Sequence, residues 1–101
     1  RFVELPLFTK TTKKIGMLAS EVEKLKTELE GNPTKGDLIQ QSGGLRKIRV
    51  ASHGKGKSGG SRVIYYLSTP HEVILVMAYS KSQADTLTAE QINILRKIIK
   101  N

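Results

Sequence analysis

The stretch VILVMAY, residues 73–79, is apolar at every position except for the hydroxyl group of its last tyrosine. An unbroken apolar run of this length is typical of a β-strand that is covered on both faces and lies inside a sheet. Two earlier segments alternate as strands do: GLRKIRVA, residues 44–51, and SRVIYYLS, residues 61–68. The segment TPHE, residues 69–72, supplies the turn into the apolar strand. Together these segments predict three consecutive antiparallel strands.

The N-terminal part of the chain predicts one short strand and two helices. FVEL, residues 2–5, alternates briefly as a strand and ends before Pro6. A first helix is expected over residues 7–19, and a second helix follows a capping box formed by Ser20 and Glu23. The buried stripe expected on this second helix consists of Val22, Leu25 and Leu29.

A helix also closes the chain, beginning at a second capping box formed by Thr88 and Gln91. Its expected apolar side consists of Ile92, Leu95, Ile98 and Ile99. The element order β-α-α-β-β-β-α predicts a small α+β domain over residues 1–101, with helices against one face of an antiparallel sheet. We expect no exposed apolar helix face, and therefore a monomer.

Positive charge is concentrated in one part of the sequence. The net charge is +8, and the window from Leu38 to His71, which contains no Asp or Glu, carries six of these eight charges. A one-sided positive field favours a polyanionic partner. Nucleic acid is favoured over a membrane because the cations lie on strands and a loop rather than along an amphipathic helix. The six residues are Arg46, Lys47, Arg49, Lys55, Lys57 and Arg62.

The stretch SHGKGKSGGSR, residues 52–62, is rich in glycine and basic residues and contains no acid. Gly56, Lys57 and Ser58 match the end of a nucleotide-binding P-loop, but Ala51 stands where the first glycine belongs. A strand rather than a helix follows, which also argues against a P-loop. A plain hairpin connection explains the glycines but explains the charge poorly.

No metal or cofactor is expected from the sequence. The chain has no cysteine, which agrees with a reducing cytoplasm, and its two imidazoles, His53 and His71, lack an accompanying carboxylate cluster. The apolar runs are too short to span a membrane, and RFVELPLF, residues 1–8, lacks the features of a signal peptide. We therefore expect a cytoplasmic protein.

Five motifs occur in a recognisable order along the chain. They are N-P-x-x-G-D-L-I at residues 32–39, G-G-L-R-K-I-R at 43–49, the lysine-glycine loop, S-R-V-I-Y-Y at 61–66, and Y-x-K at 79–81 before a helix that starts with L-T. In this layout the chain resembles the HigB-like branch of the RelE/ParE toxin superfamily over essentially its whole length. The resemblance implies a RelE-like fold.

The resemblance also implies a function. Members of this branch are toxins of type II toxin-antitoxin systems that act as ribosome-dependent endoribonucleases, cut mRNA in the ribosomal A site and inhibit translation. The implied partners are the 70S ribosome, mRNA and a cognate antitoxin, through which the complex binds operator DNA. Two alternatives remain open: a non-catalytic RNA- or ribosome-binding protein, and a DNA gyrase inhibitor of the ParE branch, which shares the fold.

Cleavage of a phosphodiester without a metal requires an activated 2′-hydroxyl, a stabilised phosphate charge and a protonated leaving oxygen. Arg62 matches the arginine that family members aim at the scissile phosphate, so we expect it to stabilise the transition state. Lys55 and Lys57 match the loop lysines of the family, and one is expected to be the base and the other a phosphate clamp. Lys81 is expected to supply the acid or a further phosphate contact.

Other residues are expected to hold RNA. If Ile48 and Val50 point into the core, strand alternation turns Lys47 and Arg49 outward, where they would contact the RNA backbone. Tyr79 is expected either to stack on a base or to end the core strand. The full set of expected RNA-binding residues is Lys47, Arg49, Arg46, His53 and Tyr79.

Overall fold

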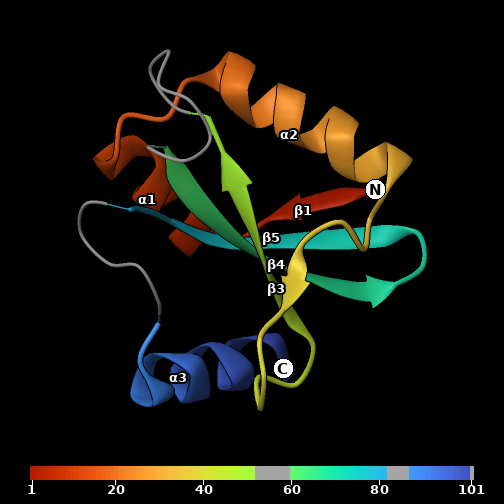
Figure 1. The fold of residues 1–101 in the computed structure, drawn as a ribbon, viewed down its shortest axis with the longest axis vertical. Coiled ribbons are helices and arrows are strands. Elements are labelled where there is room, and N and C mark those ends of the chain that lie inside the picture. Colours follow the sequence, from red (N-terminus) through yellow and green to blue (C-terminus); the bar gives the residue numbers. More distant parts are fainter. Residues whose placement is uncertain (52–59, 82–86, 101) are drawn as a thin grey trace.

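The computed structural model describes residues 1–51, 60–81 and 87–100 of the chain. Its centre is a five-stranded sheet with the strand order β1-β5-β4-β3-β2 (Figure 1). The strands are β1 (Phe2–Glu4), β2 (Asp37–Leu38), β3 (Leu45–Val50), β4 (Ser61–Thr69) and β5 (Glu72–Ser80). The helices of the described ranges are α1 (Pro6–Lys14), α2 (Ala19–Gly31) and α3 (Ala89–Lys100).

The sheet is mixed rather than fully antiparallel. Strands β2 to β5 pair with their neighbours in antiparallel fashion, whereas β1 pairs in parallel with β5, with Phe2 opposite Val73. The α+β class and the expected elements are confirmed, and the structure adds the two-residue strand β2. The prediction of an antiparallel sheet was wrong for β1, because strand direction depends on a pairing partner about 70 residues further along the chain.

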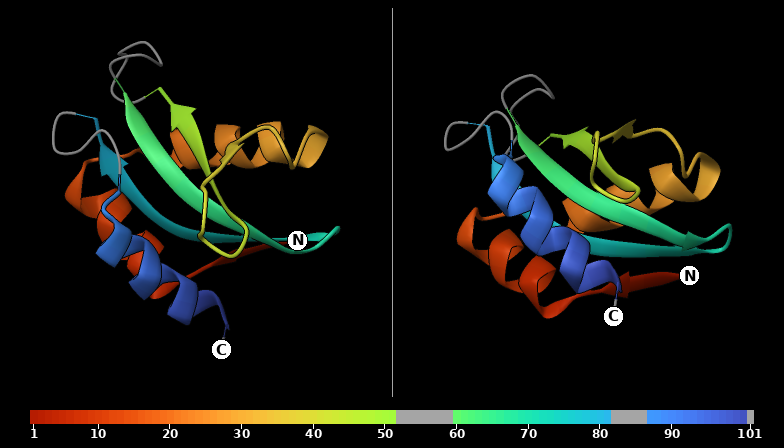
Figure 2. Two further views of the ribbon diagram at one scale, coloured as in Figure 1. Left: turned by 60° about the horizontal axis from the view of Figure 1, so that its bottom comes forward. Right: turned by 90° about the horizontal axis from the view of Figure 1, so that it is seen from below.

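Helices cover both faces of the sheet, and we call these faces the α2 side and the α3 side (Figure 2). On the α2 side, Val63 and Tyr65 belong to a buried cluster with Leu25 of α2. On the α3 side, Ile64 lies in a second cluster with Leu95 of α3. The prediction that helices cover one face was therefore wrong. Consecutive apolar residues on β4 point to opposite faces, so both faces need a cover.

Helix α1 lies along β5 where β1 ends, beside α3 in both views of Figure 2. The backbone N–H of Ala78 donates to Thr11 Oγ1 at 2.9 Å, and the N–H of Leu5 donates to Leu75 O at 3.1 Å. A helix hydroxyl thus takes the place of a strand partner at this edge of the sheet. Phe8 anchors α1 in the α2-side cluster and is fully buried.

The two expected capping boxes had different outcomes. Helix α3 begins as predicted, because the Thr88 N–H donates to Gln91 Oε1 at 2.9 Å and the Gln91 N–H donates to Thr88 Oγ1 at 3.1 Å. Helix α2 begins one residue before Ser20, and the N–H of Leu18 donates to Glu21 Oε1 at 2.7 Å. The expected box at Ser20 and Glu23 was therefore wrong.

Helix α3 packs one side against the sheet through Leu95, which is 3% exposed. Its outer side exposes Ile94 and Ile98, so the expectation of no exposed apolar helix face was wrong. Within the described ranges, none of the helices is long and apolar enough to cross a membrane.

Candidate functional site

A row of polar side chains crosses three neighbouring strands on the α3 side. Arg49 on β3 lies opposite Arg62 on β4, and Arg62 lies opposite Tyr79 on β5. Residues directly opposite each other in a sheet share a face. Lys47 shares that face because it lies two positions before Arg49 on the same strand. We call Lys47, Arg49 and Arg62 the cationic row.

Within the cationic row, Arg49 and Arg62 lie toward the end of the α3 side, whereas Lys47 lies opposite Ile64 in its apolar part. The α3-side cluster contains Leu45 from the start of β3 and Ile64 from β4, packed with Leu95. Arg49 and Arg62 lie closer to the end of the sheet where β3 ends and β4 begins. The same face therefore changes from apolar to basic along these two strands.

Arg62 is held inside the protein, with 4% of its surface exposed, and its Nη1 donates to Ser61 O at 3.5 Å. Such burial excludes the alternative of an ordinary surface arginine on a strand end. Arg62 lies directly opposite Arg49 on the same face, and a guanidinium group is suited to contact a phosphate. Since Arg62 is so little exposed, a phosphate would reach it only after neighbouring side chains move.

The ends of three strands come together next to Arg62. A Cβ atom at Gly60 would collide with the carbonyl oxygen of Val50, so a side chain there would force β3 and β4 apart. The backbone N–H of Lys81 donates to Gly60 O at 3.3 Å, which ties the end of β5 to the same place. The structure thus brings exposed Lys81 to the same end of the sheet as Arg62.

The predicted loop residues Lys55, Lys57 and His53 lie outside the described residues. The chain enters this segment after Ala51 and leaves it at Gly60, two residues before Arg62. Their assignment as base, phosphate clamp and RNA contact therefore stays a prediction.

Arg46 lies on the α2 side, away from the cationic row. Its Nη1 donates to Thr34 O at 3.1 Å and to Gly36 O at 2.7 Å. Tyr65 holds the same segment, because its hydroxyl accepts from the Gly36 N–H at 2.9 Å and donates to Pro33 O at 2.7 Å. Burial raises the pKa of Tyr65 above its usual value, which keeps the phenol in the form that can donate. The structure thus gives Arg46 backbone carbonyls as partners.

The segment held by Arg46 and Tyr65 requires a glycine. A Cβ atom at Gly36 would lie 2.7 Å from Tyr65 Cε1 and 2.8 Å from the hydroxyl oxygen. Sequence reasoning noticed the N-P-x-x-G-D motif but missed that this glycine packs against a tyrosine 29 residues later.

Tyr79 is 6% exposed and belongs to the α3-side cluster with Leu95. This placement favours the reading in which Tyr79 ends the core strand over the reading in which it stacks on a base.

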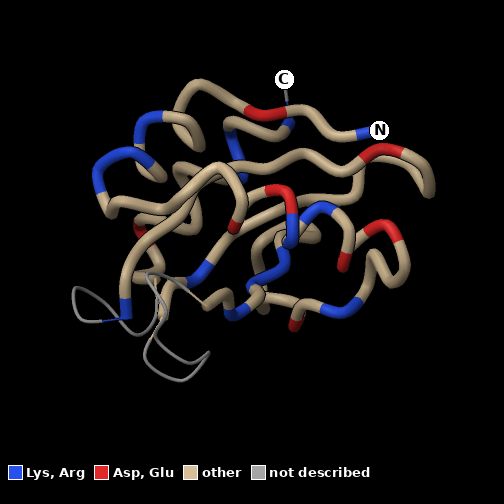
Figure 3. Tube along the Cα trace, turned by 90° about the horizontal axis from the view of Figure 1, so that it is seen from above, with Lys and Arg blue, Asp and Glu red and all other residues tan. Residues whose placement is uncertain are grey.

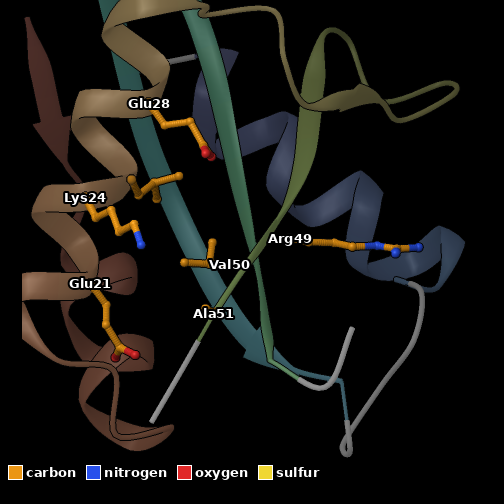
Figure 4. A pocket seen from close by; sticks show the side chains of 7 residues that line it. Glu21, Lys24, Glu28, Arg49, Val50 and Ala51 are labelled. Atoms are coloured by element: carbon orange, nitrogen blue, oxygen red, sulfur yellow. The ribbon is translucent and has the colours of Figure 1, made fainter. Parts of the chain in front are cut away.

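Two open pockets border β3. One, of about 230 Å³, lies between α2 and β3 and is lined in part by Glu21, Lys24 and Glu28. Figure 4 shows that Val50 points toward α2 whereas the Arg49 side chain points away from it. Among its described lining residues two carboxylates balance two cations, so this pocket lacks the excess positive charge that favours a polyanion.

The other pocket, of about 290 Å³, lies at the edge of the sheet beside Lys47. It was missed by sequence reasoning. Its lining residues are Asp37, Leu38, Ile39, Lys47, Leu87 and Ile92. The signal in the sequence was Leu38, an apolar residue that directly follows Asp37. The structure leaves Leu38 58% exposed.

Basic residues are spread over helices as well as strands, so charge alone does not locate the site (Figure 3). The part of the chain that the structure describes contains no group of three or more His, Cys, Asp or Glu residues suited to hold a metal ion. What distinguishes the cationic row is the buried arginine opposite a second arginine. Guanidinium groups are chemically suited to contact phosphate oxygens and to stabilise negative charge.

A small α+β domain with basic residues at one end of its sheet is consistent with the RelE-like fold. A family model described as the RelE toxin of the RelE/RelB toxin-antitoxin system matches residues 4–101. The chain belongs to this toxin family. Membership implies a cognate antitoxin as its partner.

Proposed function

We propose that this RelE-family toxin is a ribosome-dependent endoribonuclease of the HigB-like branch, which cuts mRNA in the ribosomal A site and thereby inhibits translation. The observation that carries the proposal is the placement of buried Arg62 directly opposite Arg49. Both residues share one face of neighbouring strands, and guanidinium groups are suited to contact phosphate oxygens.

The proposed reaction uses the RNA's own 2′-hydroxyl group. Its oxygen attacks the adjacent phosphorus and gives up its proton to a base, the bond from phosphorus to the 5′-oxygen breaks, and an acid protonates that oxygen. The products are a 2′,3′-cyclic phosphate and a free 5′-hydroxyl. Arg62 stabilises the extra negative charge of the pentavalent phosphate. Lys55 and Lys57 are the candidates for base and clamp, and Lys81 for acid or phosphate contact.

The remaining basic residues position the RNA. Lys47 and Arg49 lie on the same face as Arg62 and would hold neighbouring phosphates. His53 remains a candidate RNA contact. Arg46 and Tyr79 are assigned indirect roles, because Arg46 holds a backbone segment and Tyr79 packs in the core.

The proposed cellular setting follows from the family. The toxin acts in the cytoplasm on the 70S ribosome and its mRNA without a metal or other cofactor, and the cognate antitoxin silences it. The toxin-antitoxin complex binds operator DNA through the antitoxin.

The experiment that tests this function is primer extension on a defined message translated in a purified system. We expect discrete cuts at A-site codons in the presence of ribosomes, and an intact message when ribosomes are omitted. An intact message with arrested translation would instead identify a non-catalytic ribosome-binding protein. Gyrase-dependent DNA breaks without cut messages would identify a gyrase inhibitor.

A further inference from the structure

The pocket beside Lys47 has a chemistry that the proposed cleavage reaction does not use. Four of its six lining residues are apolar: Leu38, Ile39, Leu87 and Ile92. The other two are Asp37, which offers a carboxylate, and Lys47, which offers an ammonium group. In the residues that the structure describes, these two charged groups form no ion pair with each other, although Asp37 and Lys47 lie opposite each other in the sheet.

The pocket continues directly from the cationic row. Lys47 belongs to both, and it lies two positions before Arg49 on β3. A rise of about 3.3 Å per residue separates these two Cα atoms by roughly 7 Å. A strand of RNA whose phosphate lies at Arg49 and Arg62 would therefore bring an adjacent nucleotide to the pocket.

We propose that this pocket binds the base of a nucleotide next to the scissile phosphate and sets the base preference of cleavage. This inference rests on the proposed function, because it assigns the pocket to the same RNA. The pocket volume of about 290 Å³ lies just below the roughly 300–1,000 Å³ typical of small-molecule sites, which suits one base rather than a whole nucleotide.

The lining residues match the two kinds of surface that a base presents. The apolar side chains would contact its flat faces, and Leu38, which is 58% exposed, has apolar surface available for this contact. The Asp37 carboxylate accepts hydrogen bonds, so it would select a base with N–H donors on its Watson–Crick edge. Guanine presents two adjacent N–H donors there, whereas uracil presents one donor between two carbonyl groups. The pocket therefore favours guanine over uracil.

The walls of the pocket are fixed by hydrogen bonds before any ligand binds. Arg46 and Tyr65 hold the backbone at Gly36, next to Asp37. On the other side, Ile39 N–H donates to Leu45 O at 2.9 Å, and Ser42 Oγ donates to Ile39 O at 2.5 Å. Arg46 would thus act as a positioning residue for the pocket from the opposite face of the sheet.

The first test is binding in the absence of ribosomes, observed through the methyl NMR signals of Leu38, Ile39, Leu87 and Ile92. We expect guanosine monophosphate to shift these signals at a concentration on the order of tenfold lower than uridine monophosphate, and ribose 5-phosphate to leave them in place. Asp37→Asn should remove the guanosine preference. Glu90→Gln, which neutralises an exposed carboxylate on α3 outside the pocket, should keep it.

The second test measures cleavage rates on ribosomes programmed with every base at each position of the A-site codon. We expect Asp37→Asn to reduce the guanine preference at one position on the order of tenfold, and Arg62→Ala to slow cleavage about 10²–10³-fold while the guanosine-induced NMR shifts persist. Equal shifts by ribose 5-phosphate, or an unchanged preference in Asp37→Asn, would overturn the pocket assignment alone. Guanosine binding in the pocket without any RNA cleavage would support the base site and overturn the proposed nuclease function.

Discussion

The two sides of the sheet use alternate residues of the same strands for different purposes. On the α2 side, Ile48 and Val50 are buried in a continuous apolar cluster that reaches the end of β3. On the α3 side, the apolar cluster takes only Leu45 from β3, and the next residues on that face, Lys47 and Arg49, carry charge. The difference teaches that β3 stays apolar to its end on the α2 side, which stabilises the fold, whereas its α3 side becomes basic toward the same end.

The largest effect on stability is expected on the α2 side. Leu29 is fully buried, so Leu29→Ala removes apolar contacts and leaves a cavity that should lower the free energy of unfolding by about 2–5 kcal/mol. Urea denaturation measures this change, with Lys24→Ala on the exposed side of the same helix as the control. A loss below about 1 kcal/mol would break the comparison, because the α2 side would then contribute little to stability.

A smaller loss is expected when the Tyr65 hydroxyl is removed. Tyr65→Phe keeps the ring but leaves the buried N–H of Gly36 without its acceptor, which should cost about 1–3 kcal/mol. Chemical denaturation measures this loss, and Tyr66→Phe is the control because Tyr66 lies on the α3 side. The comparison distinguishes the loss of the Tyr65 hydrogen bond from the general effect of removing a hydroxyl group. Equal stability of the two variants would contradict the proposed role of Tyr65.

Arg46 and Arg49, three positions apart on β3 and on opposite faces of the sheet, sharpen the comparison further. Arg46→Ala should lower the free energy of unfolding by about 1 kcal/mol, because it removes hydrogen bonds to Thr34 O and Gly36 O. Arg49→Ala should leave stability within about 0.5 kcal/mol but weaken RNA binding and reduce its salt dependence by about one phosphate contact. Denaturation and salt-dependent RNA titration of both variants test this expectation. If both variants lost the same stability and the same RNA affinity, the assignment of Arg46 to the fold and Arg49 to RNA would be refuted.

The smallest effect on stability is expected for the ion pair between Lys26 and Glu4, and this effect should decrease at alkaline pH. The hydrogen bond from Lys26 to Glu4, at 2.8 Å, raises the pKa of Lys26 above its usual 10.5. A raised pKa stabilises the folded state below the unfolded pKa, and this contribution is lost as the pH rises through the folded value. We therefore expect Lys26→Met to cost about 0.2–1 kcal/mol at pH 8 and less above pH 11. Urea denaturation at both pH values checks this, and a growing cost at high pH would contradict it.

Local patterns in the sequence predicted local structure well. The capping box at Thr88 and Gln91 was correct in both of its hydrogen bonds because it involves neighbouring residues only. The direction of β1 was missed because it depends on pairing with Val73, far along the chain. Residues 73–79 were predicted to be covered on both faces, but the helices were expected on one face only, although consecutive apolar residues at positions 63–65 also indicated two covers.

The same distinction applies to the candidate site. Strand alternation correctly separated Lys47 and Arg49 from Ile48 and Val50. It could not predict that Arg62 is buried, because burial depends on the strands on either side. The structural role of Arg46 could not be predicted for a similar reason. Its partners Thr34 and Gly36 lie in a connection before the strand, and the sequence does not show where that connection runs.

The most direct test of the central claim is single-turnover cleavage by Arg62→Ala on programmed ribosomes, with toxin binding to those ribosomes measured in the same samples. If Arg62 stabilises the transition state, its loss should slow cleavage about 10²–10³-fold at saturating toxin while ribosome binding weakens only slightly. A cleavage rate at saturation equal to that of the unmodified protein would contradict the account, because Arg62 would then contribute to binding alone.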